Sequence, residues 1–343
     1  MFELHLGGVT TQFRFEACDL IRSRHNHCLI LGVCDENTQG YLPNGVDSEV
    51  AIASGESHKD WHSVERILAS ALKLGLARDD MIVGVGGGVV CDLAAFAASV
   101  YNRGCRLILG PTTLLAMIDA SFGGKTGFDF GGVKNLIGTF YAAEEVVIDL
   151  SSLATLSARE YRSGIAEAIK HAMLDDDELF SLLDARHDAV MSRDTGCVTQ
   201  LIESSIRVKG NIVEADLRES GVRRHLNLGH TFGHALESAS GFSVTHGEAV
   251  AWGIGRSLSL GLRLGITDPV FALKSVRLLE RYGFSLAAAD VDPELILRDI
   301  RRDKKRGSGE LNFVVQKHLG ETLVLAVDEP TIAEIIVADS ILE

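Results

Sequence analysis

The chain has 343 residues, and its 33 Lys and Arg against 47 Asp and Glu give a formal net charge of −14. This length predicts about two domains, and 46% apolar with 23% charged residues argues against extensive disorder or a fibrous chain. The acidic balance argues against nucleic acid or an anionic membrane surface as a partner, although it leaves room for a local basic pocket. The sequence has no apolar stretch long enough to cross a membrane and begins without the pattern of a secretory signal, so we expect a cytoplasmic protein.

The first 150 residues alternate short apolar runs with helical patterns. Buried strands are predicted at Cys28–Val33, Val50–Ala53, Met81–Val85, Arg106–Leu109 and Val146–Asp149. Helices are predicted over Asp60–Leu76, with Asp60 as the N-cap, and over the Ala-rich segment Asp92–Tyr101. This alternation predicts a mainly parallel, Rossmann-like sheet covered by helices.

The rest of the chain is mostly helical in pattern. Helices are predicted at Ser157–Met173, Asp176–Leu183, Val198–Arg218, Thr231–Ala239, His246–Leu264, Pro269–Tyr282 and Thr331–Leu342, and strands at Leu311–Val315 and Thr322–Val327. We therefore expect an α/β domain over residues 1–150 and a mostly α-helical domain over residues 151–343. The cleft between two domains is the usual place for an active site.

The cysteines lie mostly within apolar runs and form no CxxC pair. They are Cys18, Cys28, Cys34, Cys91, Cys105 and Cys197. This pattern predicts small buried thiols of a reducing compartment, and neither a disulfide framework nor a thiolate metal site.

Two glycine-rich segments could approach a ligand. Gly86-Gly87-Gly88 follows a strand and opens a helix, where the backbone can come close to a phosphate, although a tight turn without a ligand explains the pattern equally well. It is not the GxGxxG fingerprint. Gly123–Gly127 is not a P-loop, because Asp119 stands where the first glycine would be required. We predict that it forms a loop that presents Lys125.

Two patterns in the second half could bind a metal or a substrate. Glu167 and Lys170 share one helix face, and their apolar neighbours indicate a buried pair, although this spacing alone also fits a surface ion pair. His230 and His234 are four residues apart on one helix, and His246 opens another. Imidazoles with a carboxylate suit Zn²⁺, but the histidine spacing alone fits a structural role as well. HExxH is absent, which argues against a zincin protease.

Basic side chains lie close to these segments in an otherwise acidic chain. They are Arg103, Lys125, Lys134, Lys170, Lys209, Arg223, Lys304 and Lys305. Cations beside glycine-rich loops suggest a small, multiply anionic substrate, although each of them alone fits a solvated surface charge.

The motifs together resemble the 3-dehydroquinate synthase family in order and spacing. The matching blocks are GGGVVCDLAAFAASVYNRG, PTTLLAMIDASFGGKTG, KNLIGTFY, GIAEAIKH, RRHLNLGHTFGHALE and HGEAVAWG, within about residues 28 to 316. That family belongs to the sugar-phosphate cyclases, which are related in fold to metal-dependent glycerol dehydrogenases. The resemblance implies an NAD-binding N-terminal domain, a metal- and substrate-binding C-terminal domain, and a homodimer.

The resemblance also implies the reaction. The substrate would be 3-deoxy-D-arabino-heptulosonate 7-phosphate, a small phosphorylated and carboxylated sugar, and the products 3-dehydroquinate and phosphate. A lyase of this kind serves the shikimate pathway by transient oxidation, phosphate elimination, reduction and aldol cyclisation. The implied cofactors are NAD and one divalent metal, Zn²⁺ or Co²⁺.

Individual roles carry over only to positions that match the family's motifs. The implied metal ligands are Glu167, His230 and His246. The implied catalytic residues are Lys170, Lys125, Asp119, Lys209 and His234. The implied substrate-binding residues are Arg103, which would act across the dimer interface, and Asn135, Arg223, Asn227, Lys304 and Lys305. The implied NAD-binding residues are Asp35, Asn37, Glu56, Lys59, Gly87, Gly88, Asp92, Thr112, Thr113 and Thr155, and Glu160 matches a position near the cofactor or the metal.

The chain departs from the family pattern in places. The segment Asp35–Ser48 has room for a turn where the family has a helix, which bears on the adenosine contacts. In the loop GFDFGGVKN, Phe128, Asp129 and Gly131 replace an aliphatic residue, Asn and Pro, which bears on the substrate. Cys91 replaces a glycine, and we expect a small buried thiol there.

Other activities remain open. A sister cyclase making a valiolone, a deoxygadusol or a 2-deoxy-inosose would use a substrate without the carboxylate, and such relatives tend to change the positions of Arg223, Asn227 or His234, which this chain keeps. A glycerol dehydrogenase-like oxidation has no need for the Lys and Arg set. A non-catalytic NAD- and metal-binding relative would be expected to lose Lys170, Asp119 or a metal ligand.

Overall fold

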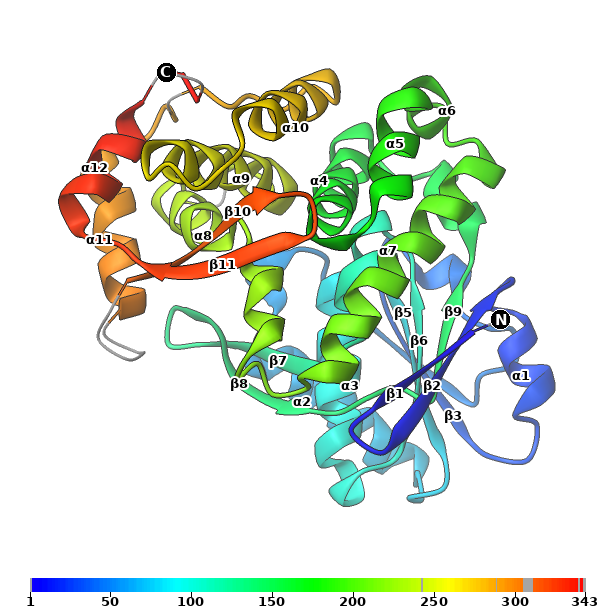
Figure 1. Ribbon diagram of the computed structural model, residues 1–343. Coiled ribbons are helices and arrows are strands. Elements are labelled where there is room, and N and C mark those ends of the chain that lie inside the picture. Colours follow the sequence, from blue (N-terminus) through cyan, green and yellow to red (C-terminus); the bar gives the residue numbers. More distant parts are fainter. Residues whose placement is uncertain (1, 242, 288, 305–310, 339, 342–343) are drawn as a thin grey trace. The chain divides into compact units, whose positions relative to one another are not determined.

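The computed structural model describes residues 2–241, 243–287, 289–304, 311–338 and 340–341, without the side chains of residues 303 and 304. The chain divides into two compact units, Met1–Ser157 and Ala158–Glu343, called here the N-terminal and C-terminal units. Figure 1 labels their helices and strands.

A seven-stranded sheet forms the centre of the N-terminal unit. In spatial order its strands are β1 (Phe2–Leu6), β2 (Val9–Phe15), β9 (Glu145–Ile148), β6 (Arg106–Pro111), β5 (Met81–Gly86), β3 (Ile30–Asp35) and β4 (Ser48–Ile52). Only β1 pairs antiparallel among these strands, and the other neighbours are parallel. The predicted mainly parallel sheet is confirmed.

Both faces of this sheet are buried, which explains why its strands are continuous apolar runs. Along β3, Leu31 and Val33 join the core formed with α2 (Trp61–Leu74) and α3 (Gly88–Val100). The alternate residues Ile30 and Cys34 join a core on the other face, with α1 (Leu20–Arg24). Asp60 caps α2 as predicted, because its carboxylate accepts a 2.9 Å hydrogen bond from the Ser63 N–H.

The link from β3 to β4 contains a single helical turn, η1 (Gln39–Tyr41), and this confirms that the segment has no room for a full helix. Leu42, just after this turn, packs over Gly32 of β3, where a Cβ atom would lie 3.0 Å from its side chain. The short link therefore covers the sheet directly with its own apolar side chains.

Several elements of the N-terminal unit differ from the prediction. The β1–β2 hairpin and α1 were not predicted. The loop expected around Lys125 is wrong, because Lys125 begins β7 (Lys125–Phe130), which pairs with β8 (Val133–Phe140). Helix α3 begins at Gly88 and not at Asp92. The remaining short turns are η2 (Glu56–His58), η3 (Tyr101–Arg103), η4 (Ala116–Ala120) and η5 (Leu150–Ala154).

The C-terminal unit is mostly helical, as predicted. Its helices are α4 (Ala158–Asp175), α5 (Asp177–Ala185), α6 (His187–Met191), α7 (Thr195–Ala215), η6 (Val222–Asn227), α8 (His230–Ala239), α9 (His246–Arg263), α10 (Pro269–Arg281), α11 (Pro293–Lys304) and α12 (Glu329–Val337). The hairpin of β10 (Asn312–His318) and β11 (Glu321–Ala326) lies against α9 (Figure 1). Phe232, Trp252 and Phe313 pack together in the core that joins α8, α9 and β10.

Two predicted helix ends in this unit need correction, and two helices, α6 and α11, were not predicted. The predicted helix ending at Arg218 ends at Ala215, because the Asp216 carboxylate binds the N–H groups of Ser220 and Gly221 and turns the chain. The last helix ends at Val337 and not at Leu342.

The six cysteines all lie within the described residues and are free. Five are buried as predicted, and Cys28 is half-buried. None of the helices in the described parts of the chain combines the length and the apolar character needed to cross a membrane.

The start of α9 is fixed by a capping box. The Glu248 carboxylate accepts from the Thr245 N–H at 2.9 Å, and the Thr245 hydroxyl accepts from the Glu248 N–H at 3.3 Å. Arg159 of α4 donates to the same carboxylate at 2.7 Å. Burial raises the pKa of Glu248, but the hydrogen bonds from Arg159 and Thr245 outweigh it and lower the pKa from 4.5 to about 2.

We predict that Glu248→Ala lowers the free energy of unfolding at pH 7 by about 1–2 kcal/mol, mostly through the lost cap, since the exposed ion pair adds little. The folded-state pKa lies below the ordinary value of 4.5, so the carboxylate's contribution is full above 4.5 and disappears as the pH falls toward 2. Urea unfolding at neutral and acidic pH measures this difference, with Glu280→Ala, an exposed glutamate of α10, as the control. A difference that stays constant down to acidic pH would contradict the prediction.

Candidate functional site

The predicted NAD-binding residues gather at one edge of the sheet in the N-terminal unit. Parallel strands end at the same edge, and Asp35, Gly87 and Thr112 stand at or just after the carboxyl ends of the neighbouring strands β3, β5 and β6. The chain runs outward from β3 to β4 and in the opposite direction from β5 to β6, so this edge lies at a topological switch point. Open α/β sheets bind their ligands at such points.

Hydrogen bonds tie these strand ends together. The Thr112 N–H donates to the Gly86 carbonyl at 2.9 Å. The Thr38 hydroxyl can donate its proton to either of two acceptors, the Val85 carbonyl at 2.8 Å or the Asp35 carboxylate at 3.0 Å. The ends of β3, β5 and β6 therefore form one connected surface.

The N-terminus of α3 is shaped for close contact with a ligand. Gly87 is the N-cap of α3. In the part of the chain that the structure describes, no side-chain hydrogen bond caps this end of the helix. A Cβ atom at Gly87 would lie 3.3 Å from Thr113, and one at Gly88 would lie 3.3 Å from Ala120, so the glycines keep this surface open. N–H groups at such an end attract the phosphates of a dinucleotide. These residues fit NAD.

Lys59 links a predicted cofactor residue to a predicted substrate residue. Its buried ammonium lies 2.6 Å from the Asp92 carboxylate at the start of α3 and 2.6 Å from the Asn135 side-chain oxygen on β8. Its carbonyl accepts from the Asp129 N–H at 2.7 Å, and the Asp129 carboxylate accepts from the Asn135 N–H at 2.8 Å. The β7–β8 hairpin is thus attached to the cofactor edge of the sheet.

The remaining predicted cofactor residues lie beside this edge. Asn37 is exposed and donates its N–H to Asp35 at 2.9 Å, and Glu56 lies 3.6 Å from Lys134. Thr155 is exposed after β9 and shares a 3.1 Å hydrogen bond with the Tyr41 hydroxyl. Each of them follows the carboxyl end of a parallel strand.

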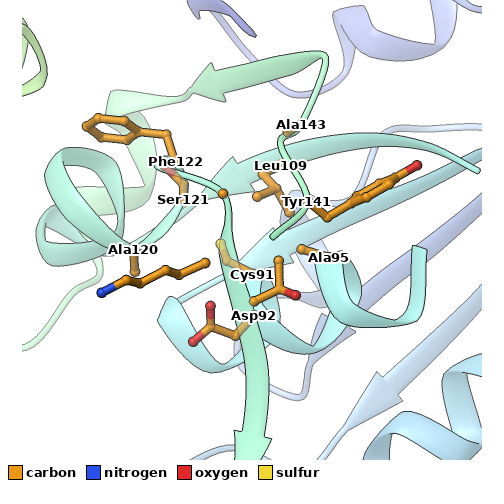
Figure 2. A pocket seen from close by; sticks show the side chains of 12 residues that line it. Cys91, Asp92, Ala95, Leu109, Ala120, Ser121, Phe122, Tyr141 and Ala143 are labelled. Atoms are coloured by element: carbon orange, nitrogen blue, oxygen red, sulfur yellow. The ribbon is translucent and has the colours of Figure 1, made fainter. Parts of the chain in front are cut away.

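A small pocket of the N-terminal unit joins the two predicted sets. It is lined by Asp92, a predicted cofactor residue, and by Lys125, a predicted catalytic residue, together with Cys91 and Ser121. Figure 2 shows the Cys91, Asp92 and Ser121 side chains around it. Asp119 lies next to it along the chain, half-buried in the turn η4. The strand β7 therefore brings Lys125 to the start of α3.

Arg103 is not brought to this edge. It lies exposed in η3, after the 13-residue helix α3 has run about 20 Å back to the amino end of β6. Asn102 and Arg103 have left-handed φ values of 50° and 62°, which hold the guanidinium in a turn on the surface. Within its own N-terminal unit, Arg103 lies at the opposite edge of the sheet from Asp35 and Gly87.

In the C-terminal unit the three predicted metal ligands meet. Glu167 of α4 is fully buried, and its Oε1 lies 3.2 Å from Nε2 of His246 and 3.5 Å from Nε2 of His230. Its Oε2 lies 2.5 Å from the buried Nζ of Lys170. One ligand atom from each of Glu167, His230 and His246 lies within 4.8 Å of the others.

The spacing and the charges of this cluster suit a divalent cation. Ligands about 2.0–2.2 Å from one tetrahedral ion lie roughly 3.4 Å from each other, close to the distances seen here. Burial raises the pKa of Glu167, but Lys170 and the two histidines lower it far below its ordinary value, so the carboxylate is ionised. Burial and Lys170 hold the pKa of His230 far below its ordinary value, so that imidazole is neutral. A neutral imidazole and an ionised carboxylate are the forms that bind metal.

His246 differs from His230. Burial would lower its pKa, but hydrogen bonds to Glu167 and Glu237 raise it to about 10. His246 thus faces two carboxylates, and a metal ion bound by both His246 and Glu167 would replace the proton on Nε2. The residues present fit one divalent metal.

Backbone contacts at glycines bring the three ligand-bearing helices together. A Cβ atom at Gly247, next to His246, would overlap the backbone of Ser163 on α4, whose hydroxyl accepts the Gly247 N–H at 2.9 Å. A Cβ atom at Gly233 of α8 would lie 2.9 Å from the Ala249 carbonyl of α9. The motifs therefore contain glycine because α9 touches α4 and α8 within one turn of each histidine ligand.

The other predicted residues of this unit lie around the cluster's helices. Lys209 is buried on α7, against which η6 packs. In η6, buried Arg223 donates to the Leu217 carbonyl at 2.5 Å, and half-buried Asn227 donates to Glu219 at 2.6 Å. His234 is exposed, with its ring 5.0 Å from that of His230.

The remaining predicted residues of this unit are Glu160, Lys304 and Lys305. Glu160 is exposed in the first turn of α4. Lys305 lies outside the described residues, as does the side chain of Lys304 at the end of α11.

Sequence reasoning did not single out Glu237, Asp216 and Ser163. Glu237 lies three residues after His234 and seven after His230, a helical spacing that could have placed it on the same face. Asp216 shapes the loop before Arg223 by accepting three backbone N–H groups, a role with no signal beyond its Asx type.

Comparison with known proteins identifies what the chain resembles. The family model described as 3-dehydroquinate synthase N-terminal matches residues 49–163, and that described as 3-dehydroquinate synthase C-terminal matches residues 164–306. The 3-dehydroquinate synthase of Pseudomonas aeruginosa is 41% identical over 277 residues, which are 80% of this chain and 75% of that protein. That of Caulobacter vibrioides is 40% identical over 282 residues, covering 80% and 76%.

Solved structures share the fold. A 2-epi-5-epi-valiolone synthase from Streptomyces hygroscopicus, with NAD⁺ and Zn²⁺ bound, has a TM-score of 0.87 and 25% identity and covers 96% of each chain. A 2-deoxy-scyllo-inosose synthase with carbaglucose-6-phosphate, NAD⁺ and Co²⁺ has a TM-score of 0.87 at 22% identity, covering 98% of this chain and 99% of that one. A probable glycerol dehydrogenase from Sinorhizobium meliloti has a TM-score of 0.64 at 17% identity and covers 95% of each chain.

The contact between Gly247 and Ser163 generates a prediction. Gly247→Ala should separate α9 from α4 and lower the bound Zn²⁺ or Co²⁺ per chain at least tenfold at limiting metal, because His246 moves away from Glu167. Metal analysis after dialysis measures this loss. Gly196→Ala is the control, since a Cβ atom on that α7 glycine would make only an ordinary 3.5 Å contact with Asp194. Equal metal content in the two variants would contradict the prediction.

Proposed function

This chain belongs to the 3-dehydroquinate synthase family, and from that premise we propose that it converts 3-deoxy-D-arabino-heptulosonate 7-phosphate to 3-dehydroquinate and phosphate. The enzyme would be a lyase that depends on NAD and one divalent metal. The observation that carries the proposal is the buried Glu167 carboxylate, with two imidazoles at one oxygen and Lys170 at the other. Buried charges are costly and gather at functional sites, which favours an enzyme over a protein that only binds a ligand.

Both cofactors have residues that would hold them. The metal would be bound by Glu167, His230 and His246, and NAD by the glycine-rich start of α3 and the strand ends around Asp35 and Thr112. When bound, NAD takes and returns a hydride, and a divalent metal polarises the oxygens of the substrate.

The residues of the cluster itself would position protons and charge. Glu167 supplies a fixed negative charge, and the Lys170 ammonium, 2.5 Å away and buried, is held where it can donate to a substrate hydroxyl. Burial strengthens these interactions because little water competes for the same groups. Lys170 would thus orient the reacting hydroxyl.

The cationic residues would select a doubly anionic substrate. Arg223 is buried and oriented by its bond to the Leu217 carbonyl, and its planar guanidinium suits a carboxylate or phosphate. Lys125, Asn135, Asn227, His234 and one of Lys304 and Lys305 would also hold the carboxylate and the phosphate. Asp119 and Lys209 would bind ring hydroxyls. The retained Arg223 and Asn227 favour the carboxylated substrate over those of the sister cyclases.

We also propose a homodimer in which Arg103 serves the partner's site. Its exposed position at the opposite edge of the sheet from Asp35 and Gly87 supports this, because a side chain there is directed away from its own unit's cofactor edge. Six free cysteines support a reducing compartment, and we place the enzyme in the cytoplasm.

The first test is the reaction itself. The purified chain should release phosphate from 3-deoxy-D-arabino-heptulosonate 7-phosphate with NAD⁺ and Zn²⁺ or Co²⁺, and should be inactive after chelation, because the Glu167 cluster then lacks its cation. Mass spectrometry should identify 3-dehydroquinate. His246→Ala should abolish activity and lower the metal content, whereas an unchanged metal content would refute the ligand set. No release by a chain that binds NAD and metal would instead favour a sister cyclase.

The second test concerns Arg103. Arg103→Ala and Lys170→Ala should each lose nearly all activity, but their equimolar mixture, after subunit exchange, should regain about a quarter of the wild-type activity, since half of the dimers then contain one intact site. Phosphate release measures the recovery, and Arg103→Ala should keep its metal. A mixture no more active than its components would show that Arg103 does not act across the interface.

A further inference from the structure

Two imidazoles of the cluster have the same arrangement around their rings. His230 and His246 both direct Nε2 toward Oε1 of Glu167, at 3.5 and 3.2 Å. Behind each ring an acceptor faces Nδ1. For His230 it is the Leu228 carbonyl at 3.2 Å, and for His246 it is Oε1 of Glu237 at 3.5 Å.

A neutral imidazole carries one N–H donor and one lone pair, so its partners decide which nitrogen has the proton. An acceptor at Nδ1 keeps the N–H there when a metal takes the Nε2 side of the ring. In the metal-bound form of both rings, the Nε2 lone pair then points to the side where Glu167 lies. Two nitrogens and one carboxylate oxygen consequently converge on one point.

Glu237 differs from the acceptor behind His230 in its charge. It is a carboxylate on α8 with 5% of its surface exposed, and such a group is rarely buried without a partner. An ionised acceptor makes a stronger hydrogen bond than a carbonyl, and a metal-bound imidazole backed by a carboxylate becomes a stronger ligand. Glu237 is also two helical turns from His230. One face of α8 therefore carries the ligand His230 and the carboxylate that contacts the second histidine ligand, His246.

We propose that Glu237 is a positioning residue that fixes the Nδ1–H tautomer and the orientation of His246 for metal binding through Nε2. This rests on the metal site of the proposed function, but it holds for any reaction of the loaded site. Glu237 would not touch the substrate or the metal itself. It acts on the affinity and the ligand field of the site through His246.

The test measures metal binding in the full chain, without substrate. Glu237→Gln keeps the shape and removes the charge, and we expect its Kd for Co²⁺ and Zn²⁺, from competition with a chromophoric chelator, to rise about 10–100-fold. Its Co²⁺ visible spectrum should shift, because the field at His246 changes, and Glu237→Asp should recover part of the affinity. Kd and spectrum equal to those of the wild type would overturn the proposal.

The control variant is Asp299→Asn. Asp299 is a neighbouring carboxylate with a side chain only 7% exposed, which holds α8 through a 2.5 Å hydrogen bond from Ser238, one residue after Glu237. It should leave both the Kd and the spectrum unchanged. An equal loss of affinity in this control would show that Glu237 acts through general packing of α8, which overturns the specific role.

A measurement on the unaltered protein keeps the proposal testable should Glu237→Gln fail to fold. With ¹⁵N-labelled histidine in the Zn²⁺-loaded chain, NMR should show His246 bound through Nε2 with a proton on Nδ1. Metal on Nδ1, or a second Zn²⁺ equivalent on His234, Glu237 and His246, would overturn the proposal. Because these measurements need no turnover, an inactive chain that binds metal as described would refute the proposed reaction and leave this inference standing.

Discussion

The contact of α9 with α4 and α8 at glycines is the constraint on which the candidate metal site depends. Each of these helices carries one ligand, and the ligand atoms converge only because a backbone without Cβ atoms lets Gly247 touch Ser163 and Gly233 approach Ala249. Close-packed interiors respond to a single added methyl group. The positions beside the ligands are therefore as restricted as the ligands themselves, although they take no part in chemistry.

The two units offer ligands different kinds of groups. In the N-terminal unit, the edge formed by β3, β5 and β6 presents backbone N–H groups at Gly87 and Gly88, held in place by threonine hydrogen bonds. In the C-terminal unit, the chemistry lies in buried side chains, with Glu167 at the centre of Lys170 and two imidazoles. Backbone groups suit a phosphate that must bind and not react, whereas ionisable side chains suit atoms that change charge.

The sequence predicted those elements in which apolar residues recur with the period of a strand or a helix. Examples are the strand Met81–Val85, the helix capped by Asp60 and the buried face of the helix that carries Glu167. The β7–β8 hairpin has no such pattern, because it is glycine-rich and β8 is mostly exposed, and its place depends on Lys59, which is distant in sequence. The alternation of polar and apolar residues in β1 and β2 around Gly7-Gly8 is a hairpin signal that can be read from the sequence.

The site residues show the same contrast between what a local motif marks and what depends on contacts between distant parts of the chain. The family motifs marked Glu167, His230 and His246 directly, and their spacing in the chain alone left the metal open. Glu237 was missed as a partner of His246 because the spacing along α8 relates it only to His230 and His234, whereas His246 lies on another helix. Arg103 shows the complementary case, since its residue type suggested a substrate contact while its position at the amino end of β6 follows only from the length of α3.

Convergence of α4, α8 and α9 on one point has a consequence for the lifetime of the protein in a cell. A cation held by one residue from each helix binds the folded chain and not the unfolded one, so at a thousand times its Kd it would add about 4 kcal/mol to the free energy of unfolding. Where metal is scarce, the chain would unfold more often and meet proteases more often. The abundance of the protein would then follow the supply of metal, even without any control of its synthesis.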